Sequence, residues 1–382
     1  MHDNPFSMAE IASRLDAVRA RLSALGLDAA IFASAENVFY LTGLDHWGYF
    51  APHLLLVSLS GQPVLVTRAM ERVSVEKQAR WAVFHGHSDS ETAADTMARI
   101  LNDQRLGGKR LGLEHWTAGM SHGLAQSLTA QCEAQWSDVS GLVDDLRLVK
   151  SVEEQALMRR AAAISDLAAQ VAIDAISDGA RECEIAATCL AAMTKAGGHP
   201  PGFGPFIRPG GRLGEEHASW GEERYRSGEP VFLELSGCIS RYHAPLGRLV
   251  HIGSMRDEDR EMAECSQAAF QAVVAGLRPG RLAKDIYADW QRIVDEAGLS
   301  HYRRHHCGYC VGIGFPPCWT GGNSVRGLRS DSTLEIREGM SFHILSWLMG
   351  TGRGDYFLSN TVLLGPSGAE VLTKTDAGPI IR

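Results

Sequence analysis

The 382-residue sequence contains neither a long hydrophobic run nor an excess of positive charge. No apolar stretch approaches the about 20 residues that a membrane-spanning helix requires, so we predict no membrane insertion. The net charge is −8 and no stripe of lysine and arginine is present. Because phosphate binding requires a basic surface, this charge argues against a nucleic-acid partner. We therefore expect a small-molecule substrate.

We also expect neither a secretory leader nor a disulfide framework. The first residues lack a basic segment followed by an apolar one, and their pattern predicts an amphipathic helix instead. Eight cysteines in a chain of this length, several next to histidine or inside apolar runs, indicate free thiols. We expect a reducing compartment and place the protein in the cytoplasm.

The length favours two domains, because a single core rarely serves so many residues. Residues 1–146 alternate strand-like and helical segments. Strands are predicted at 29–34 and 54–68, and helical periodicity appears at 74–83 and 91–104. This alternation predicts an N-terminal α/β domain.

The second predicted domain spans residues 147–382. Ser151 and Glu154 have the spacing of a capping box, which predicts the start of a long alanine-rich helix directly after the boundary. Further helices, predicted at 182–197, 257–277 and 282–298, are interspersed with strand pairs. We therefore predict an α+β domain with helices on one face of an antiparallel sheet.

One acid stands out in the stretch FLELSGCISRYHAPLGR, residues 232–248. The pattern predicts a strand, a turn at Gly237–Cys238 and a second strand, with Glu234 where the first strand would otherwise be apolar. A buried acid is costly unless it is paired or hydrogen-bonded. The candidate partners are basic side chains: His217, His243 and Arg248. A structural pair of Glu and Arg remains the alternative to a functional acid.

Three other segments carry side chains that suit either a site or a core. Residues 303–319 read RRHHCGYCVGIGFPPCW, in which Cys307 and Cys310 form a C-x-x-C motif beside two histidines. This is a weak zinc signal, since no second C-x-x-C follows at zinc-ribbon spacing. The glycine-punctuated loop at 41–53 contains Trp47 and Tyr49, and an apolar strand near the end contains His343 and Trp347: all four suit a core or a ligand site.

Taken in order, these segments resemble the creatinase and aminopeptidase P family, known as M24. The resemblance covers nearly the whole chain and rests on FYLTGL, LRLVKSVEEQALMRRAA, FLELSGCISRYHAPLGRL, HHCGYCVGIG and EGMSFHILSWL. It implies a creatinase-type α/β domain at 1–146 and the α+β pita-bread fold at 147–382.

The resemblance also identifies the positions where the family's metallopeptidases hold two metal ions. Those enzymes use two Asp, one His and two Glu, which correspond here to Glu234, Pro245, Tyr309, Leu345 and Ser359. Pro and Leu side chains have no ligand atoms, and one acid remains. The resemblance to the metal-free branches of the family therefore implies no metal and no other cofactor.

Among those branches the sequence is most similar to ectoine hydrolase. The similar segments are DHWGYF, HASW, the GC and RYHAPLGR parts of residues 237–248, the GY and PPCW parts of residues 308–319, and MSFH. This implies hydrolysis of a C–N bond in a small amidine-like or cyclic nitrogen compound. Glu234 would be the nucleophile and His217 the general acid and base. The sequence departs from that branch in PPCWTG and at Ser359, and from creatinase at Gly247, so a related but different substrate is expected.

From the same resemblance we expect substrate contacts from six side chains: Trp47, Tyr49, His243, Arg248, Tyr309 and His343. The loop with the first two often covers a neighbouring subunit's site in this family, which implies a homodimer. Two other functions stay open: a metal-dependent Xaa-Pro peptidase and a non-catalytic binding module.

Overall fold

The computed structural model describes residues 4–321 and 325–382. The six remaining residues, 1–3 and 322–324, belong to the predicted domains but lie outside the described part. After Arg147 the chain divides into two units, next to the boundary predicted after residue 146. Each unit has a hydrophobic core of its own.

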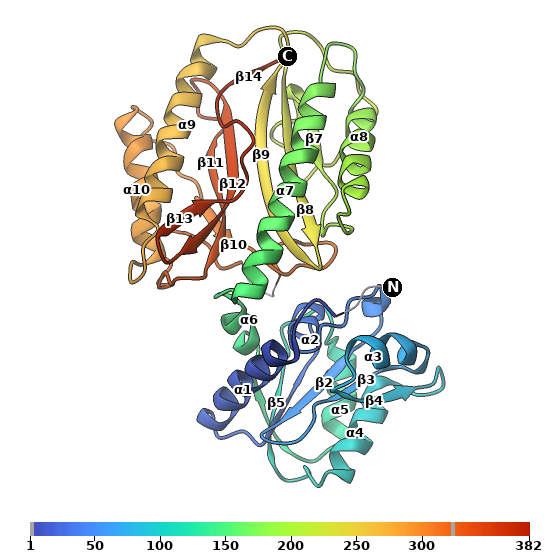
Figure 1. Cartoon of the computed structure of the whole chain (residues 1–382). Coiled ribbons are helices and arrows are strands. Elements are labelled where there is room, and N and C mark those ends of the chain that lie inside the picture. Colours follow the sequence, from blue (N-terminus) through green and yellow to red (C-terminus); the bar gives the residue numbers. More distant parts are fainter. Residues whose placement is uncertain (1–3, 322–324) are drawn as a thin grey trace. The chain divides into compact units, whose positions relative to one another are not determined.

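The N-terminal unit alternates helices and strands (Figure 1). Its elements are α1 (Met8–Ala24), β1 (Ala29–Phe32), α2 (Ala35–Thr42), η1 (Gly48–Phe50), β2 (Leu54–Ser58), β3 (Val64–Arg68), η2 (Ala69–Glu71), α3 (Arg72–Gln78), β4 (Val83–His87), α4 (Ala93–Asp103), β5 (Arg110–Leu113), α5 (His122–Gln131), β6 (Gln135–Asp138) and α6 (Leu142–Arg147).

These strands form one mixed sheet in the order β4-β3-β2-β1-β5-β6. Buried residues of the central strands pack against α4 and α5. The helix predicted at 74–83 is shorter than expected. It ends at Gln78, and Val83 donates its N–H to Pro63 O beside β3 (2.8 Å), so this end of the predicted helix joins the sheet.

The C-terminal unit combines long strands with four helices in the part of the chain that the structure describes (Figure 1). Its elements are α7 (Val152–Ala175), α8 (Glu182–Lys195), β7 (Phe206–Pro209), η3 (Gly210–Arg212), β8 (Pro230–Ile239), β9 (Tyr242–His251), α9 (Asp257–Gly276), α10 (Ala283–Glu296), β10 (Gly308–Cys310), β11 (Ser341–Leu348), β12 (Tyr356–Gly365), β13 (Gly368–Val371) and β14 (Ile380–Ile381).

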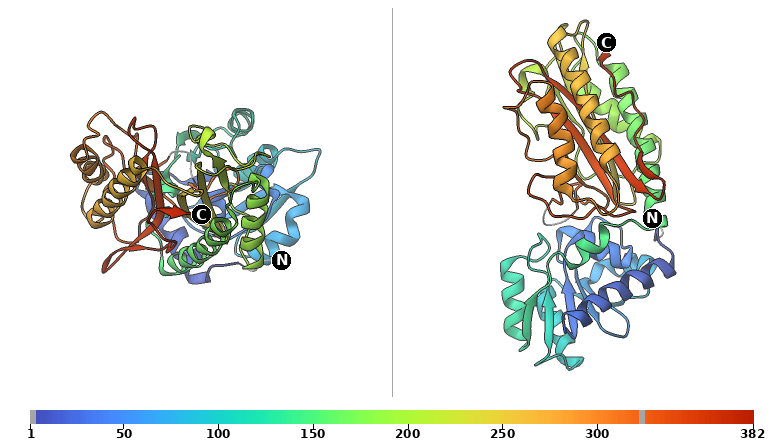
Figure 2. Two further views of the ribbon diagram at one scale, coloured as in Figure 1. Left: turned by 90° about the horizontal axis from the view of Figure 1, so that it is seen from above. Right: turned by 90° about the vertical axis from the view of Figure 1, so that its left-hand side faces the viewer.

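The main path of its sheet runs β10-β11-β12-β9-β8-β7 and is antiparallel, with β13 added to β12 and β14 to β9. Helix α7 packs on β8 and β9, and α9 packs on β11 and β12. Figure 2 shows α9 and α10 side by side across the strands. The helices thus form a layer over the sheet.

Residue alternation along the strands separates a helix-covered face from a second face. In β8, a Cβ at Gly237 would lie 2.4 Å from Ala161 O of α7, so this residue faces the helices. Glu234 lies three positions earlier and therefore points to the opposite face. In β11, Ser346 Oγ accepts a hydrogen bond from Trp290 Nε1 of α10 (3.2 Å). Its neighbours in β11 therefore face the same side as Glu234.

The predicted capping box at the start of α7 is confirmed. Glu154 N donates to Ser151 Oγ (3.2 Å), and Ser151 N donates to Glu154 Oε2 (2.9 Å). These bonds satisfy two of the N–H groups that a helix start leaves unpaired. The second unit thus begins with a well-defined helix end.

The turn predicted at Gly237–Cys238 is wrong. Both residues lie inside β8, and the hairpin turns at Ser240 and Arg241, whose φ angles are 47° and 67°. Positive φ at two central residues suits the twist of a tight hairpin. Gly237 is required by the close approach of α7, and not by a turn.

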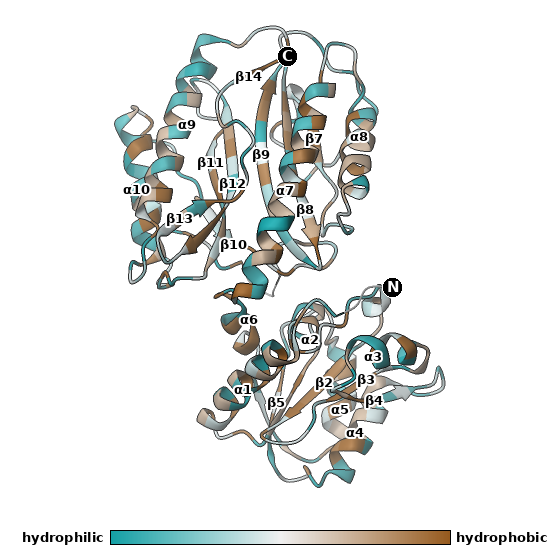
Figure 3. Cartoon of the chain, in the orientation of Figure 1, coloured by the Kyte–Doolittle hydropathy of each residue, from teal (hydrophilic) through white to brown (hydrophobic). Residues whose placement is uncertain are grey.

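Hydrophobic residues follow the sheet layers of both units. Figure 3 shows brown segments along strands such as β2 and β9, while α9 and α10 alternate between hydrophilic and hydrophobic stretches. In the described residues, no helix combines the length and the hydrophobicity that a bilayer crossing requires.

Candidate active site

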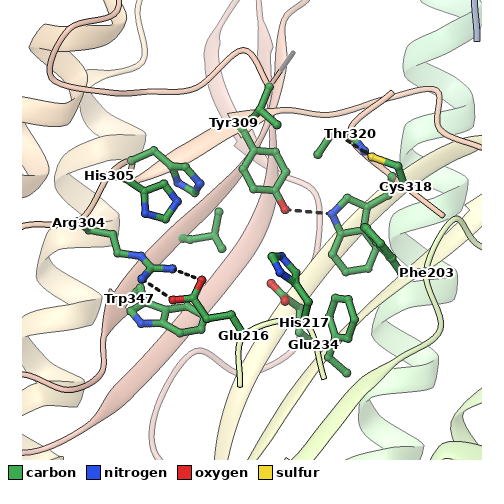
Figure 4. A pocket seen from close by; sticks show the side chains of 15 residues that line it. Phe203, Glu216, His217, Glu234, Arg304, His305, Tyr309, Cys318, Thr320 and Trp347 are labelled. Carbon is green, nitrogen blue, oxygen red and sulfur yellow. Dashed lines mark hydrogen bonds and ion pairs between the residues drawn. The ribbon is translucent and has the colours of Figure 1, made fainter. Parts of the chain in front are cut away.

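A cavity of about 340 Å³ opens on the face of the C-terminal sheet that the helices leave uncovered (Figure 4). This volume lies in the range of about 300–1,000 Å³ that is typical of small-molecule sites. Its lining residues are Phe203, Phe206, Glu216, His217, Glu234, Arg304, His305, His306, Tyr309, Cys318, Trp319, Thr320, Val325, Leu345 and Trp347.

Three aromatic rings form a wall of this cavity. Phe203 and Trp319 meet edge to face, with ring centroids 4.8 Å apart at 89°. Phe206 completes the group, 5.6 Å from Trp319 and 5.3 Å from Phe203. Aromatic faces attract cations, and a desolvated contact contributes about 2 kcal/mol. The wall therefore suits a flat or cationic ligand.

Glu234 faces the cavity from β8 with 6% of its surface exposed. In the described chain, its buried Oε1 has no hydrogen-bond partner. Burial raises the pKa of Glu234 to about 8, and the positive charge of Arg208 opposes this shift. At neutral pH this carboxyl is therefore mostly protonated, with an oxygen available to a ligand.

Arg208 of β7 is the cation with the larger effect on the pKa of Glu234, ahead of Arg304, and the sequence did not indicate it. Phe206 pairs with Glu234 across β7 and β8, which places Arg208 two residues along on the same face. Its guanidinium is fully buried over the ring of Phe232 at 3.9 Å. Nε and Nη1 lack hydrogen-bond partners in the described structure. The predicted cation, Arg248, lies elsewhere.

A chain of hydrogen bonds runs behind the cavity. Trp319 Nε1 donates to Tyr309 Oη (3.0 Å), and Tyr309 Oη lies 2.8 Å from His343 Nδ1. An indole N–H only donates, so we assign the tyrosine proton to the bond with His343. The N–H of Nε2 then points to Ser359 Oγ (2.8 Å), with Glu234 Oε1 at 3.8 Å. Burial keeps the pKa of His343 well below its usual value, so the ring is neutral.

His217 enters the cavity from an irregular turn between η3 and β8. Its ring lies 6.1 Å from that of Phe206, and no hydrogen bond to it is present among the described residues. The adjacent Glu216 forms two bonds with Arg304, at 2.7 and 2.9 Å. His217 and Glu234 thus line one cavity, as Figure 4 shows.

Arg248 does not contact this cavity, which corrects the prediction. It pairs with Leu233, so it points to the face opposite Glu234. All five of its N–H donors are used within the fold. They bond to Gly247 O, Ser359 O, Asn360 Oδ1, Thr375 O and Asp376 O. Arg248 therefore ties the C-terminal segment to the sheet.

His243 and His343 also make their contacts within the fold. His243 is fully buried, its Nε2 accepts the N–H of Gly202 (2.7 Å), and its Nδ1 lies 2.9 Å from Arg241 O. Burial lowers the pKa of His243 to about 4. Neither ring is part of the cavity lining. Of the predicted contacts in this unit, Tyr309 reaches the cavity directly and His343 acts behind it.

Trp47 and Tyr49 belong to the N-terminal unit. Trp47 is 60% exposed. Tyr49 is more enclosed: its hydroxyl donates to Leu44 O (3.0 Å), and its ring stacks on His53 at 4.3 Å. Their predicted contact with a substrate remains a prediction.

At the positions where the family's metallopeptidases hold two metal ions, this chain has Glu234, Pro245, Tyr309, Leu345 and Ser359. Glu234, Tyr309 and Leu345 line the cavity, and Ser359 bonds to His343 behind it. Among the described residues, no three His, Cys, Asp or Glu side chains are grouped to bind one ion. One carboxylate with Pro, Tyr, Leu and Ser does not fit a dinuclear site, which requires several carboxylate and imidazole ligands.

The C-x-x-C motif is part of the core. Cys307 and Cys310 are buried free thiols. Burial raises the pKa of both, to about 11 for Cys310. Since metal ligation and nucleophilic attack require the thiolate, neither thiol is suited to these roles.

Several residues in the cavity or close to Glu234 carry no local pattern that could reveal them. Phe206 and Arg208 alternate in the short segment PFIRP, which is typical of a strand, but its pairing with Glu234 is a long-range contact. Glu216 and Arg304 lie 88 residues apart and meet only in the folded chain. Phe203 stands in a loop of glycine and proline.

The two-unit architecture, with a cavity over one face of the second sheet, defines a creatinase- or prolidase-type fold. Residues 156–366 match metallopeptidase family M24, and residues 14–149 match the creatinase/prolidase N-terminal domain. The chain therefore belongs to family M24. The Xaa-Pro dipeptidase structure from Bacillus anthracis is similar over 97% of this chain and 100% of that chain, with a TM-score of 0.86 at 21% identity. The predicted fold class is confirmed.

Two relatives point to different activities. The chain is 26% identical to ectoine hydrolase of Halomonas elongata, over 96% of both proteins. It is also 26% identical to a Xaa-Pro dipeptidase of Pyrococcus horikoshii, over 92% of this chain and 93% of that protein. Equal identities do not separate the two activities, so the side chains of the site must decide.

Proposed function

We propose that this M24 protein is a metal-independent hydrolase of a C–N bond in a small amidine-like or cyclic nitrogen compound. The observation that carries the proposal is the state of Glu234: a buried carboxyl with an unpartnered oxygen, facing an aromatic cavity. A ligand cation would supply the missing partner. The similarity to ectoine hydrolase supports the same class of substrate.

In the proposed reaction, the ionised Glu234 adds to the electrophilic carbon of the amidinium group and forms a covalent bond. His217 lines the same cavity and donates a proton to the departing nitrogen as the C–N bond breaks. The neutral His217 then removes a proton from water, which displaces Glu234. The carboxylate is regenerated, and His217 regains the proton that it donated.

The surroundings assist this chemistry in two ways. Arg208 opposes the effect of burial on Glu234 and favours the ionised form. Phe203, Phe206 and Trp319 provide faces for the substrate cation, whose charge favours the same ionised form. Binding and activation of the carboxylate are therefore coupled.

An assay of two substrate classes tests the proposal. Ectoine, creatine and related amidines are incubated with the protein beside Xaa-Pro dipeptides, and mass spectrometry detects new amines and acids. We expect hydrolysis within the amidine group and none of the dipeptides. Dipeptide hydrolysis alone would establish the peptidase alternative, and cation binding without turnover would establish the binding module.

The activity should depend on pH through Glu234. The pKa of the free protein's carboxyl is about 8 and the ionised form is reactive, so kcat/KM should rise by about tenfold per pH unit below that value. A pH profile of kcat/KM for the substrate identified above measures this, and a limb centred near the ordinary pKa of glutamate would contradict the assignment.

We further propose a homodimer in which Trp47 contributes to the partner's site. The exposure of Trp47 and of Phe50, at 60% and 81%, supports a role for this loop at an interface. Trp47→Ala should weaken ligand binding by about fivefold or more, as the loss of a cation–π contact predicts. Sedimentation at decreasing concentration, with binding measured in parallel, checks it: a monomer that binds with unchanged affinity would refute the proposal.

A further inference from the structure

Hydrogen bonds and an ion pair hold the turn that carries His217 at two places. On one side, the buried carboxylate of Glu182 accepts the N–H of Gly221 (2.5 Å) and a bond from Arg212 Nη1 (3.2 Å). On the other, Glu216 is held by Arg304. Residues 213–221 have no helix or strand between these points. Two longer bonds, from Ser219 Oγ to Pro205 O and from Arg212 Nη2 to Ser219 O, both 3.4 Å, add to these contacts. The position of His217 therefore depends on side-chain contacts at both ends of the turn.

Arg304 is itself held in place. Its carbonyl accepts a hydrogen bond from Tyr287 Oη of α10 (2.6 Å). Its guanidinium lies over the ring of Trp347 at 4.5 Å, and Trp347 is a buried residue of β11. The arginine is thus attached to two regular elements, while Glu216 belongs to the turn. Figure 4 shows this pair at the cavity.

The geometry of the pair restrains the orientation of the Glu216 side chain. Arg304 Nη1 and Nη2 donate to Glu216 Oε1 and Oε2 separately, so the two planar groups lie in a fork-to-fork arrangement. Such a pair restrains orientation as well as distance, which a lysine ammonium cannot do. Because His217 is the next residue, restraining Glu216 restrains the direction from which the imidazole enters.

We propose that Glu216 and Arg304 are positioning residues that hold the His217 turn over the cavity. The kinetic part of this inference rests on the proposed role of His217. The structural part does not, because the mobility of the turn can be measured without a substrate.

Hydrogen exchange of the full-length protein tests the structural part. Arg304→Met should speed amide exchange in residues 213–221 by about 10- to 100-fold, as the loss of a charge-assisted pair predicts. Arg304→Lys should have an intermediate effect. Arg303→Met is the matched control, since its partner Asp295 lies in α10 and away from the turn. Exchange in β8 and β9 should not change.

Kinetics tests the second part. With a substrate in hand, Arg304→Met and Glu216→Gln should each lower kcat by about 10- to 100-fold with KM changed little, because a misplaced acid–base group slows the chemical step. Unchanged exchange in the turn, or an effect confined to KM, would overturn the inference. If no C–N substrate is found, the proposed function fails, and the exchange result still decides whether the pair holds the turn.

Discussion

Glu234→Gln should lower turnover by about 1,000-fold or more. The amide keeps the shape of the side chain but has no carboxylate to add to the amidinium carbon. The loss should fall on kcat and should not recover at high pH, because glutamine does not ionise. Steady-state kinetics on the identified substrate measures it, with Glu296→Gln, an exposed acid of α10, as the matched control.

Stability provides the check that this variant is folded. The folded-state pKa of Glu234, about 8, is raised above the reference of 4.5, so the folded chain binds an extra proton between these values. Stability from this group is present below pH 4.5 and is lost as pH rises through 8. The glutamine variant lacks this loss and should be more stable than the wild type at pH 9, by about 2 to 5 kcal/mol. A variant that unfolds earlier at that pH would contradict the buried environment of Glu234.

His217→Ala should lower kcat by about 100- to 10,000-fold, the usual range for a general acid and base. No described hydrogen bond involves the ring, so the substitution should leave the thermal unfolding temperature nearly unchanged. His122→Ala, an exposed histidine at the start of α5, is the control. Near-normal turnover by the alanine variant would remove His217 from the mechanism.

Short-range patterns, and the order of the conspicuous segments, predicted much of the fold from the sequence. Ser151 and Glu154 predicted the start of α7 because a capping box involves only adjacent turns. Glu234 was recognised because an acid in an apolar strand is unusual in itself. The order of the conspicuous segments was sufficient to predict both domain folds.

The sequence predicts His217 beside Glu234, and both line one cavity, but it does not predict Arg208, because strand register is set by long-range contacts. Arg248 was proposed as a partner, but its pairing with Leu233 turns it to the other face. Arg208 is the arginine that lies on the face of Glu234, through the pairing of β7 with β8. Gly237 was interpreted as a turn residue, whereas its role is to admit α7, a contact that spans the sheet and the helix layer.

The central claim is hydrolysis without a metal, and one measurement tests it most directly. The protein is dialysed against a strong chelator, its metal content is determined by mass spectrometry, and turnover of the identified substrate is compared before and after. Glu234 with Pro245, Tyr309, Leu345 and Ser359 does not fit a dinuclear site, so we predict unchanged turnover in the metal-free protein. Activity that disappears with the chelator and returns with about two metal ions per subunit would contradict the account.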